Sequence, residues 1–393
     1  MGRLVWRGIL ARKLRATLTA IAILLGVAMI TGTYVLTDQI DAAFEDIFAT
    51  ANEGVDVIVS PREAFESHVT EPTPLDESLV DRVRGVDGVA VAAGTIEALG
   101  SLVVNGKYVE TTGAPTLVVS NVPDPLSPGR YEAGRAPSKT GEVAVDEHLA
   151  DREDLEVGRQ VGLATRVGVR NVRITGIFSF GDAASLGGAT VVVTTFRDAQ
   201  RWFEREGKVS TIVAAAEEGV TPEELARRVA AVLPPSARVQ TGQQNAQEQA
   251  DDLTDQINSF LGPALLAFAG VAIFVGAFII FNTFSITVAQ RLREIGMLRT
   301  IGATRAQAMV NVIGEALAIG VSASLLGLAA GIGFAKVLVS AFSALGFDLP
   351  TAGLPVAPRT IVVALAVGIL VSLVAALIPA LRAARVPPVA AMR

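Results

Sequence analysis

Residues 291–305 read RLREIGMLRTIGATR and lie between two long apolar segments of the chain. Four apolar side chains recur in this stretch at three-residue intervals, namely Leu292, Ile295, Leu298 and Ile301. This spacing places them near one side of a short helix, while Arg291 and Glu294 can face elsewhere. Gly296 and Gly302 allow a second backbone to come close or the chain to turn. The stretch is therefore predicted to be a docking surface and not a site of chemistry; the alternative is a basic loop that only sets membrane orientation.

The composition indicates a membrane protein. The 393 residues are 51% hydrophobic and 18% charged, with a mean hydropathy of +0.48, which departs from the average of soluble domains. No cysteine is present, so disulfides and thiolate metal sites are excluded. Residues 38–260 hold 36 acidic and 19 basic side chains, whereas the remainder holds 3 acidic and 14 basic ones. The two parts are therefore expected to face different surroundings.

Four segments are long and apolar enough to cross a bilayer, which needs roughly 20 residues. They are residues 16–37, the charge-free run 256–290, residues 306 to the early 340s, and residues 360–381. The first follows a basic lead, as a secretory signal would, but its length and the lack of a small-residue cleavage site favour an uncleaved membrane helix. The predicted domains are 1–37, an extracytoplasmic insertion at 38–260, and 261–393.

The distribution of basic residues predicts the orientation. Five lie before residue 16, four lie in residues 291–305 and three lie after residue 381, whereas residues 343–358 hold none. We therefore expect both termini in the cytoplasm and the acidic insertion on the outer side of a bacterial cell membrane.

The third apolar segment is rich in small residues, which include Gly320, Ser324, Gly327 and Gly331. Gly327 and Gly331 form a small-xxx-small pair, which lets helices pack closely in lipid. Such packing can lie within one chain or between subunits, and the alternative is simple tolerance of glycine in membrane helices.

Two polar residues, Asn311 and Glu315, lie one helical turn apart in the same segment. A carboxylate that faces lipid is costly, so we expect Glu315 to form a polar contact with a neighbouring span or with the N-terminal basic helix. A proton relay is the alternative, but no second intramembrane acid supports it.

The insertion is predicted to be a mixed α/β domain held by two helical stalks. Apolar stripes extend the first span through Ile40, Phe44, Ile47 and Ala51, and precede the second through Ala246, Ala250, Leu253, Ile257 and Phe260; the alternative is two unrelated amphipathic caps. Strands are predicted at residues 55–60, 143–145, 161–164, 169–178 and 190–194, and helices at 76–84 and 222–232. Asn105 and Gly106 predict a hairpin with a type I′ turn.

The pattern R-x-R-E-I-G-x-L-R-x-I-G-A-x-R in residues 291–305 resembles the coupling segment of FtsX/MacB-type ABC transporter permeases. Four further segments are similar, in order, to the MacB-like periplasmic core domain: GEVAVDEHLA (141–150), LEVGRQVGL (155–163), VRITGIF (172–178) and VSTIVAAAEEGVTPEELARRV (209–229). The ending IPALRAARVPPVAAMR (378–393) is similar to that of the family. The resemblance implies an α-helical membrane protein with four transmembrane helices and a mixed α/β extracytoplasmic domain inserted between the first and second.

The resemblance also implies partners. A cytoplasmic ABC ATPase dimer would seat the coupling segment, and a second permease copy or homologous half would complete the membrane part. Polar contacts with the ATPase are expected from Arg291, Arg293, Glu294 and Arg299, and apolar anchors from Ile295, Leu298 and Ile301. Gly296, Gly302 and Arg305 complete the segment. Many relatives carry two such halves in one polypeptide, so this chain is expected to be a half-transporter or a fragment of a longer permease.

Members of this family often export or extract hydrophobic, lipid or peptide-like substrates, and we expect the same activity here. The alternative is an FtsX-like regulator of an extracytoplasmic cell-wall hydrolase or signalling partner, which in the family usually has a much smaller outer domain. A stand-alone sensor or membrane enzyme is the third alternative.

The sequence contains no catalytic constellation. The nearest approach to a phosphate-binding G-x-x-x-x-G-K-[ST] motif, at residues 100–108, is better explained as the hairpin. His68 and His148 belong to no H-E-x-x-H motif, and no G-x-S-x-G elbow is present. Three acidic residues on the second stalk are best explained as a solvated face: Asp251, Asp252 and Asp255. We therefore expect a non-catalytic subunit without metal, cofactor or nucleic acid, with ATP and Mg²⁺ on the partner ATPase.

Overall fold

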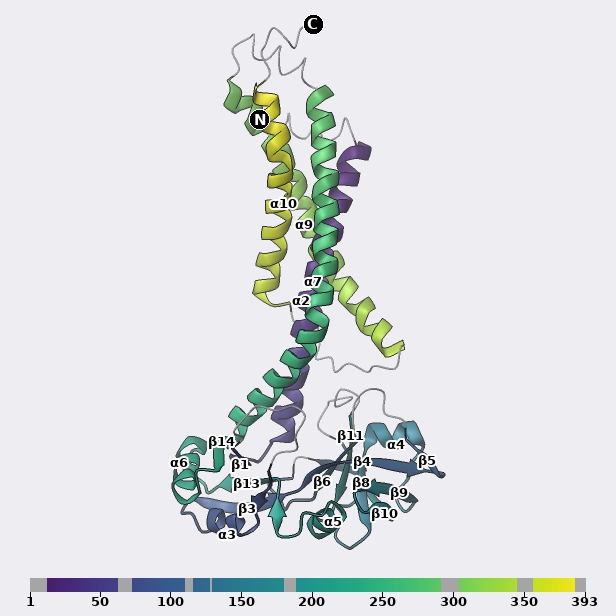
Figure 1. Ribbon diagram of the computed structural model, residues 1–393, viewed down its shortest axis with the longest axis vertical. Helices are drawn as coiled ribbons and strands as arrows, with labels where there is room; N and C mark the ends of the chain where they lie inside the picture. Colours follow the sequence, from purple (N-terminus) through teal and green to yellow (C-terminus); the bar gives the residue numbers. More distant parts are fainter. Residues whose placement is uncertain are drawn as a thin grey trace. The chain divides into compact units, whose positions relative to one another are not determined.

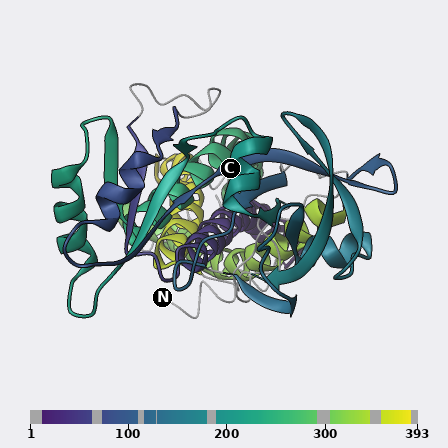
Figure 2. The same cartoon turned by 90° about the horizontal axis from the view of Figure 1, so that it is seen from below.

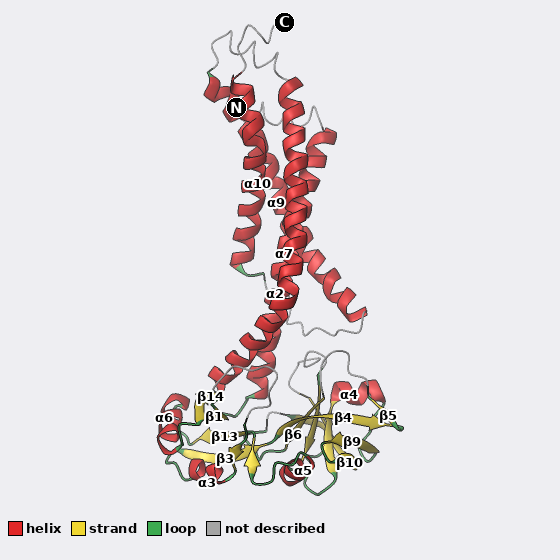
Figure 3. Cartoon of the chain, in the orientation of Figure 1, coloured by secondary structure: helices red, strands yellow, loops and turns green. Residues whose placement is uncertain are grey.

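The computed structural model describes residues 13–62, 73–109, 116–127, 129–179, 189–290, 304–344 and 356–385. The chain divides into two compact units. The first comprises Met1–Gln39, Asp255–Ala341 and Gly353–Arg393, and the second comprises Ile40–Thr254 and Phe342–Ala352. Among the described residues, strands occur only in the second unit, where Figure 3 shows them in yellow.

Four long helices build most of the first unit, and three of them continue into the second. They are α2 (Lys13–Ala51), α7 (Gly242–Gln290), α9 (Arg305–Ala344) and α10 (Pro358–Arg385), shown in Figure 1. Each contains a stretch that is long and apolar enough to cross a membrane, with mean hydropathies of 2.0, 2.7, 2.0 and 3.1 in chain order. These helices confirm the four predicted spans, and the α/β insertion follows the first of them in the sequence.

One apolar core joins the four helices of the first unit. It contains Ile23 and Val27 from α2, Ile280 and Phe284 from α7, Val312, Ala316, Ile319 and Ala323 from α9, and Ala364, Ala375 and Ala376 from α10. Nearly half of these residues are alanine, and small residues let membrane helices approach each other closely. The core therefore indicates tight helix contacts within a single chain.

The second unit contains an antiparallel sheet in the order β14 (Ala237–Thr241), β1 (Val57–Pro61), β13 (Thr211–Ala216) and β3 (Val89–Thr95). Helices α3 (Ser78–Arg84) and α6 (Pro222–Val232) pack on one face, burying Leu79, Val83, Leu225 and Val229 against Val57 and Ile212. Leu126 packs on the opposite face with Ile58 and Val213. The strands β2 (Leu75–Asp76) and β12 (Lys208–Val209) form a separate short pair.

The second unit also contains a larger mixed sheet, which has eight strands in the described part of the chain. Its order is β5 (Lys107–Tyr108), β4 (Glu97–Val104), β6 (Thr116–Ser120), β11 (Thr190–Thr194), β8 (Glu142–Asp146), β10 (Gly168–Ser179) and β7 (Arg130–Gly134), while β9 (Gln160–Thr165) pairs with β10 and β4. Its core includes residues from helices α4 (Glu147–Glu153) and α5 (Phe196–Trp202): Leu149, Ala150 and Trp202. Figure 2 shows the two sheets as separate lobes.

The predicted strands at 55–60, 143–145, 161–164, 169–178 and 190–194 are confirmed as β1, β8, β9, β10 and β11. The hairpin is also confirmed, because Asn105 and Gly106 join β4 to β5 with positive φ angles of 53° and 77°, as a type I′ turn requires. Helix α6 begins at Pro222 after the N-cap Thr221, whose hydroxyl accepts the backbone N–H of Glu224 at 3.3 Å.

The two predicted stalks leave the smaller sheet from adjacent strands. β1 follows α2 and β14 precedes α7, and the two strands pair with Val57 opposite Thr241. The backbone N–H of Gly242 donates to Asp56 O at 3.0 Å. Within the second unit, the end of α2 and the start of α7 therefore lie at the same edge of the domain.

The predicted stripes are confirmed in part; Ala51 is partly buried, and the side chains of Ile257 and Phe260 lie outside the described ones. Ile40, Phe44, Ile47, Ala246 and Ala250 are buried. The prediction was wrong at Leu253, which is 36% exposed, whereas Thr254 is 9% exposed. A helix has 3.6 residues per turn, so the buried line advances by four residues here instead of three.

Candidate functional site

The predicted coupling segment lies almost entirely outside the described residues. The residues outside are Arg291, Arg293, Glu294, Ile295, Gly296, Leu298, Arg299, Ile301 and Gly302, whereas Arg305 is the first residue of α9. The structure does describe both flanks, because α7 ends at Gln290 and α9 begins at Arg305. The structure therefore describes the helices on both sides of the segment, and their contacts are given below.

The start of α9 is fixed by a capping box. The backbone N–H of Gln307 donates to Thr304 Oγ1 at 3.2 Å, and the backbone N–H of Thr304 donates to Gln307 Oε1 at 3.0 Å. Thr241 and Gln244 make the same pair of bonds at the start of α7, at 3.1 and 3.2 Å. Reciprocal capping satisfies backbone donors that a first helical turn leaves unpaired. Both helices that flank the coupling segment therefore have a defined first turn.

Helices α9 and α10 pack through a reciprocal pair of glycine and serine residues. Ser324 of α9 lies against Gly368 of α10, where a Cβ would collide with Ser324 Oγ. Ser372 of α10 lies against Gly320 of α9, where a Cβ would be 2.9 Å from Ser372 Cβ. Each serine hydroxyl donates at 2.6 Å to the carbonyl four residues earlier in its own helix, Ser324 to Gly320 and Ser372 to Gly368. The serines are thus satisfied locally, and the two backbones come close without an unpaired hydroxyl at the contact.

The other two small residues of α9 face α2. A Cβ at Gly327 would lie 2.8 Å from Val27 Cβ, and a Cβ at Gly331 would lie 2.8 Å from Ala28 O. Val27 also lies against Gly368, where a Cβ would be 2.9 Å from Val27 Cγ2. Val27 therefore sits where α2, α9 and α10 meet. The structure places all four predicted small residues, Gly320, Ser324, Gly327 and Gly331, at contacts within one chain.

The two predicted intramembrane polar residues lie near the start of α9. Glu315 is partly buried, and Asn311 precedes it by one turn. Glu315 lies three residues after Val312 and four before Ile319, and both of these belong to the apolar core. It is therefore on the packed side of the helix.

A polar cluster that the sequence reasoning missed joins α2 to α10. Asp38 of α2 is 6% exposed, and its Oδ1 accepts a charge-assisted bond from Arg359 Nη2. Its Oδ2 accepts the hydroxyl of Thr360 at 3.1 Å. The signal was present in the sequence: Asp38 is the first charge after the apolar run 16–37, and Arg359 is the last charge before the run 360–381. Opposite charges at the matching ends of two spans predict such a pair.

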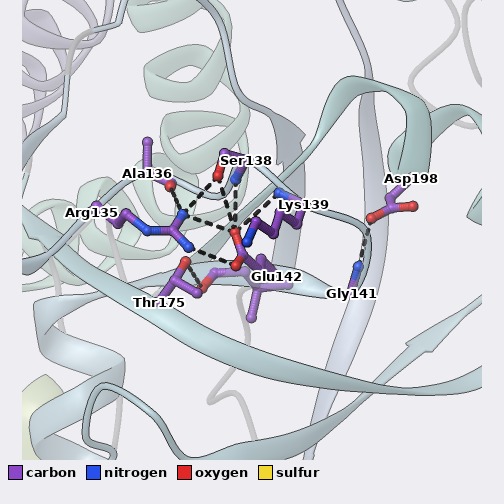
Figure 4. Close-up of polar contacts among 9 residues, drawn as sticks. Arg135, Ala136, Ser138, Lys139, Gly141, Glu142, Thr175 and Asp198 are labelled. Atoms are coloured by element: carbon purple, nitrogen blue, oxygen red, sulfur yellow. Dashed lines mark hydrogen bonds and ion pairs between the residues drawn. The ribbon is translucent and has the colours of Figure 1, made fainter.

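In the second unit, Glu142 organises the connection between β7 and β8, as Figure 4 shows. Its carboxylate accepts two bonds from Arg135, at 2.6 and 2.8 Å. It also accepts the backbone N–H groups of Ser138 and Lys139, at 2.9 and 3.0 Å. The Arg135 side chain, followed by these backbone donors, holds the pKa of Glu142 well below its ordinary value of 4.5. These hydrogen bonds give the Glu142 carboxylate a structural role, and its lowered pKa does not suit a general base.

Two buried aspartates serve the same region. Asp198 accepts the backbone N–H of Gly141 at 2.9 Å and a guanidinium bond from Arg201 at 2.6 Å (Figure 4 shows the contact with Gly141). Asp146 caps α4 by accepting the backbone N–H of Leu149 at 2.8 Å, and burial raises its pKa. The GEVAVDEHLA segment is thus explained by folding requirements. Among the described residues, no group of three side chains could hold a metal ion.

Comparison with known families assigns both parts of the chain. Residues 16–232 match the family described as MacB-like periplasmic core domain, and residues 266–388 match the FtsX-like permease C-terminal family. An uncharacterized ABC transporter permease protein of Mycobacterium tuberculosis is 26% identical over 401 residues, covering 100% of this chain and 44% of that protein. The macrolide export ATP-binding/permease protein MacB of Bdellovibrio bacteriovorus is 27% identical over 146 residues, covering 37% of this chain and 21% of that protein. The chain thus spans less than half the length of these relatives.

Two solved structures are also similar to part of the chain. The periplasmic region of MacB from Actinobacillus actinomycetemcomitans aligns with a TM-score of 0.39 and 12% identity, covering 50% of this chain and 94% of that structure. The extracellular domain of the ABC-type transporter YknZ from Gram-positive bacteria aligns with a TM-score of 0.34 and 13% identity, covering 47% and 98%.

Proposed function

Because the chain belongs to the FtsX/MacB-type ABC transporter permeases, we propose that it couples ATP hydrolysis by a separate ATPase to movement of its α/β domain. The permease itself is the non-catalytic membrane subunit. The movement serves export or extraction of a hydrophobic or peptide-like substrate on the outer side of the cell membrane.

The observation that carries this proposal is the position of residues 291–303. They connect α7, a helix of 49 residues that starts at the α/β domain and has Pro263 inside it, to α9, whose start is fixed by Thr304 and Gln307. At 1.5 Å per residue, α7 is roughly 70 Å long. A force applied at the segment would reach the α/β domain along this helix without crossing a loop.

The docking chemistry follows from the side chains of the segment. Ile295, Leu298 and Ile301 supply apolar anchors to a groove of the ATPase, while Arg291, Arg293, Glu294 and Arg299 supply polar contacts at its rim. ATP and Mg²⁺ bind to the ATPase and not to this chain. Two ATPase copies act on a dimer, in which the second permease is an identical chain or a homologous half.

The orientation follows from charge. The basic lead, the coupling segment and the basic tail face the cytoplasm, and both termini lie there. The α/β domain, which lies within the acidic part of the sequence, faces the outer side. The ATPase and the α/β domain are then on opposite sides of the membrane, as the coupling requires.

The test is co-purification with an ABC ATPase encoded next to the gene. Leu298→Asp combined with Ile301→Asp should abolish the complex and leave membrane insertion intact, because two carboxylates cannot enter an apolar groove without partners. Leu99→Asp is the matched control, since Leu99 is an exposed strand residue of the second unit. A complex that survives the double substitution with full ATPase coupling would contradict the docking assignment.

A further inference from the structure

The cluster of Asp38, Arg359 and Thr360 is asymmetric in its exposure. The side chain of Asp38 is 5% exposed, while that of Arg359 is 60% exposed. Thr360 is 1% exposed. The carboxylate is therefore seated between α2 and α10, and the guanidinium reaches it from the surface.

Breaking the contact between Asp38 and its two partners costs free energy. A buried carboxylate is tolerated only while it is paired and hydrogen-bonded, and loss of a partner leaves an uncompensated charge. Both donors come from the first turn of α10, which starts at Pro358. The N-terminus of a helix also favours a nearby negative charge. Asp38 thus holds α2 to one defined end of α10.

The position of Asp38 along α2 shows which part of the chain this contact can affect. Asp38 is two residues before Ile40, where the second unit begins, and α2 continues as one helix to Ala51. Ile40, Phe44 and Ile47 are buried in the stretch that follows. A displacement imposed on α2 at Asp38 is therefore passed along a continuous, packed helix.

The other end of the linkage is the contact between α9 and α10. Ser324 against Gly368 and Ser372 against Gly320 hold these two helices together. Helix α9 starts at Arg305, the last residue of the predicted coupling segment. A path of packed or bonded contacts thus runs from α9 to α10, and from α10 through Arg359 and Thr360 to Asp38.

We propose that Asp38, Arg359 and Thr360 form a clamp that passes the displacement of α9 and α10 to α2, and through α2 to the α/β domain. This inference rests on the proposed function and names positioning residues for it. The clamp works in parallel with α7, which reaches the same edge of the domain. Helix α2 also packs on α9 and α10 at Val27, and the clamp adds a second attachment eleven residues further along α2, next to the start of the second unit.

The test uses the absence of cysteine, which makes any introduced cysteine unique. One reporter is an environment-sensitive fluorophore at Glu45→Cys, an exposed position on α2 beyond the clamp. The second is the same fluorophore at Ala306→Cys, an exposed position at the start of α9. Each labelled chain is reconstituted in nanodiscs with its ATPase, and the fluorescence change on adding ATP and vanadate is measured.

In the otherwise unaltered chain, both reporters should respond. Asp38→Asn and Arg359→Gln should each reduce the response at position 45 by roughly threefold to tenfold and leave the response at position 306 unchanged. Arg359→Lys keeps the cation and should retain most of the response at position 45. Lys336→Gln, an exposed residue of α9 outside the cluster, is the matched control and should change neither response. If Asp38→Asn fails to insert, Arg359→Gln and Thr360→Val decide the test, since both keep the carboxylate.

A full response at position 45 in Arg359→Gln and Thr360→Val would overturn the clamp. Equal losses at both positions would also overturn it, because they would indicate general damage to the helix bundle. Silence of both reporters in the unaltered chain would contradict the proposed function itself, and the two failures are therefore distinguishable.

Discussion

Ser324 of α9 and Gly368 of α10 lie against each other so closely that no side chain fits at position 368. Ser372 and Gly320 repeat the contact with the helices interchanged. Since each serine hydroxyl is satisfied in its own helix, the contact depends on shape and not on a bond between helices. The two helix backbones therefore meet at close range along this stretch.

The glycine contacts give the first prediction. Gly327→Ala should destabilise the helix bundle by about 1–3 kcal/mol, because the new Cβ would overlap Val27. Gly333→Ala on the same helix should be neutral or slightly stabilising, since a Cβ there meets nothing within 4 Å and alanine favours helix. Thermal unfolding of both variants in nanodiscs checks this. Equal stability of the two variants would contradict the packing.

The capping box of α9 gives the second prediction. Thr304→Ala should weaken the first turn of α9 by about 0.5–2 kcal/mol, whereas Thr304→Ser should retain most of the cap. Hydrogen exchange measured by mass spectrometry should show faster exchange at the start of α9 in the alanine variant only. Unchanged exchange in Thr304→Ala would show that the start of the helix does not depend on Gln307 and Thr304.

The pKa of Glu142 gives the third prediction. Its folded-state pKa is lowered by Arg135 and by the backbone donors of Ser138 and Lys139, so its ionised form stabilises the fold. That contribution is complete above a pH of about 4.5, the ordinary value, and is lost as the pH falls below it. Glu142→Gln should therefore be less stable than the unaltered chain near neutral pH, and the difference should shrink in acid.

Thermal unfolding of the chain in nanodiscs between neutral pH and about pH 2.5 measures this difference, because the contribution is lost between the ordinary pKa and the lowered folded-state value. Glu218→Gln, which changes an exposed loop carboxylate, is the control and should follow the unaltered chain at every pH. A constant difference between Glu142→Gln and the unaltered chain across this range would contradict the assignment.

Local signals decided how much of the fold could be predicted. The four spans, α6 and the hairpin were found because charge-free length, the Thr-Pro opening and the Asn-Gly turn each act within a few residues. By contrast, β3 is rich in alanine and β7 is a mostly exposed edge strand with two charged residues. Their pairing partners are distant in the sequence, so neither strand has a strong local pattern. The stripe through Leu253 failed because its phase along a long helix could not be fixed from spacing alone.

In the candidate site too, features encoded within a few residues were predicted, and contacts between distant residues were not. The coupling segment was predicted from its own fifteen residues, and it stays a prediction because they lie mostly outside the described part of the chain. The small residues of α9 were found, but their partners, Val27, Gly368 and Ser372, required the packed structure. The contact between Asp38 and Arg359 joins residues 321 positions apart; no periodicity links them, and their signal is only the opposite charges at the ends of two apolar runs.

The most direct measurement of the central claim is cross-linking from a single cysteine at position 298. A Leu298→Cys chain in native membranes should react with a membrane-impermeant maleimide from the cytoplasmic side only, and a short bifunctional reagent should join it to the ABC ATPase. Labelling from the outer side, or the absence of any cross-link in membranes that contain the ATPase and hydrolyse ATP, would contradict the account.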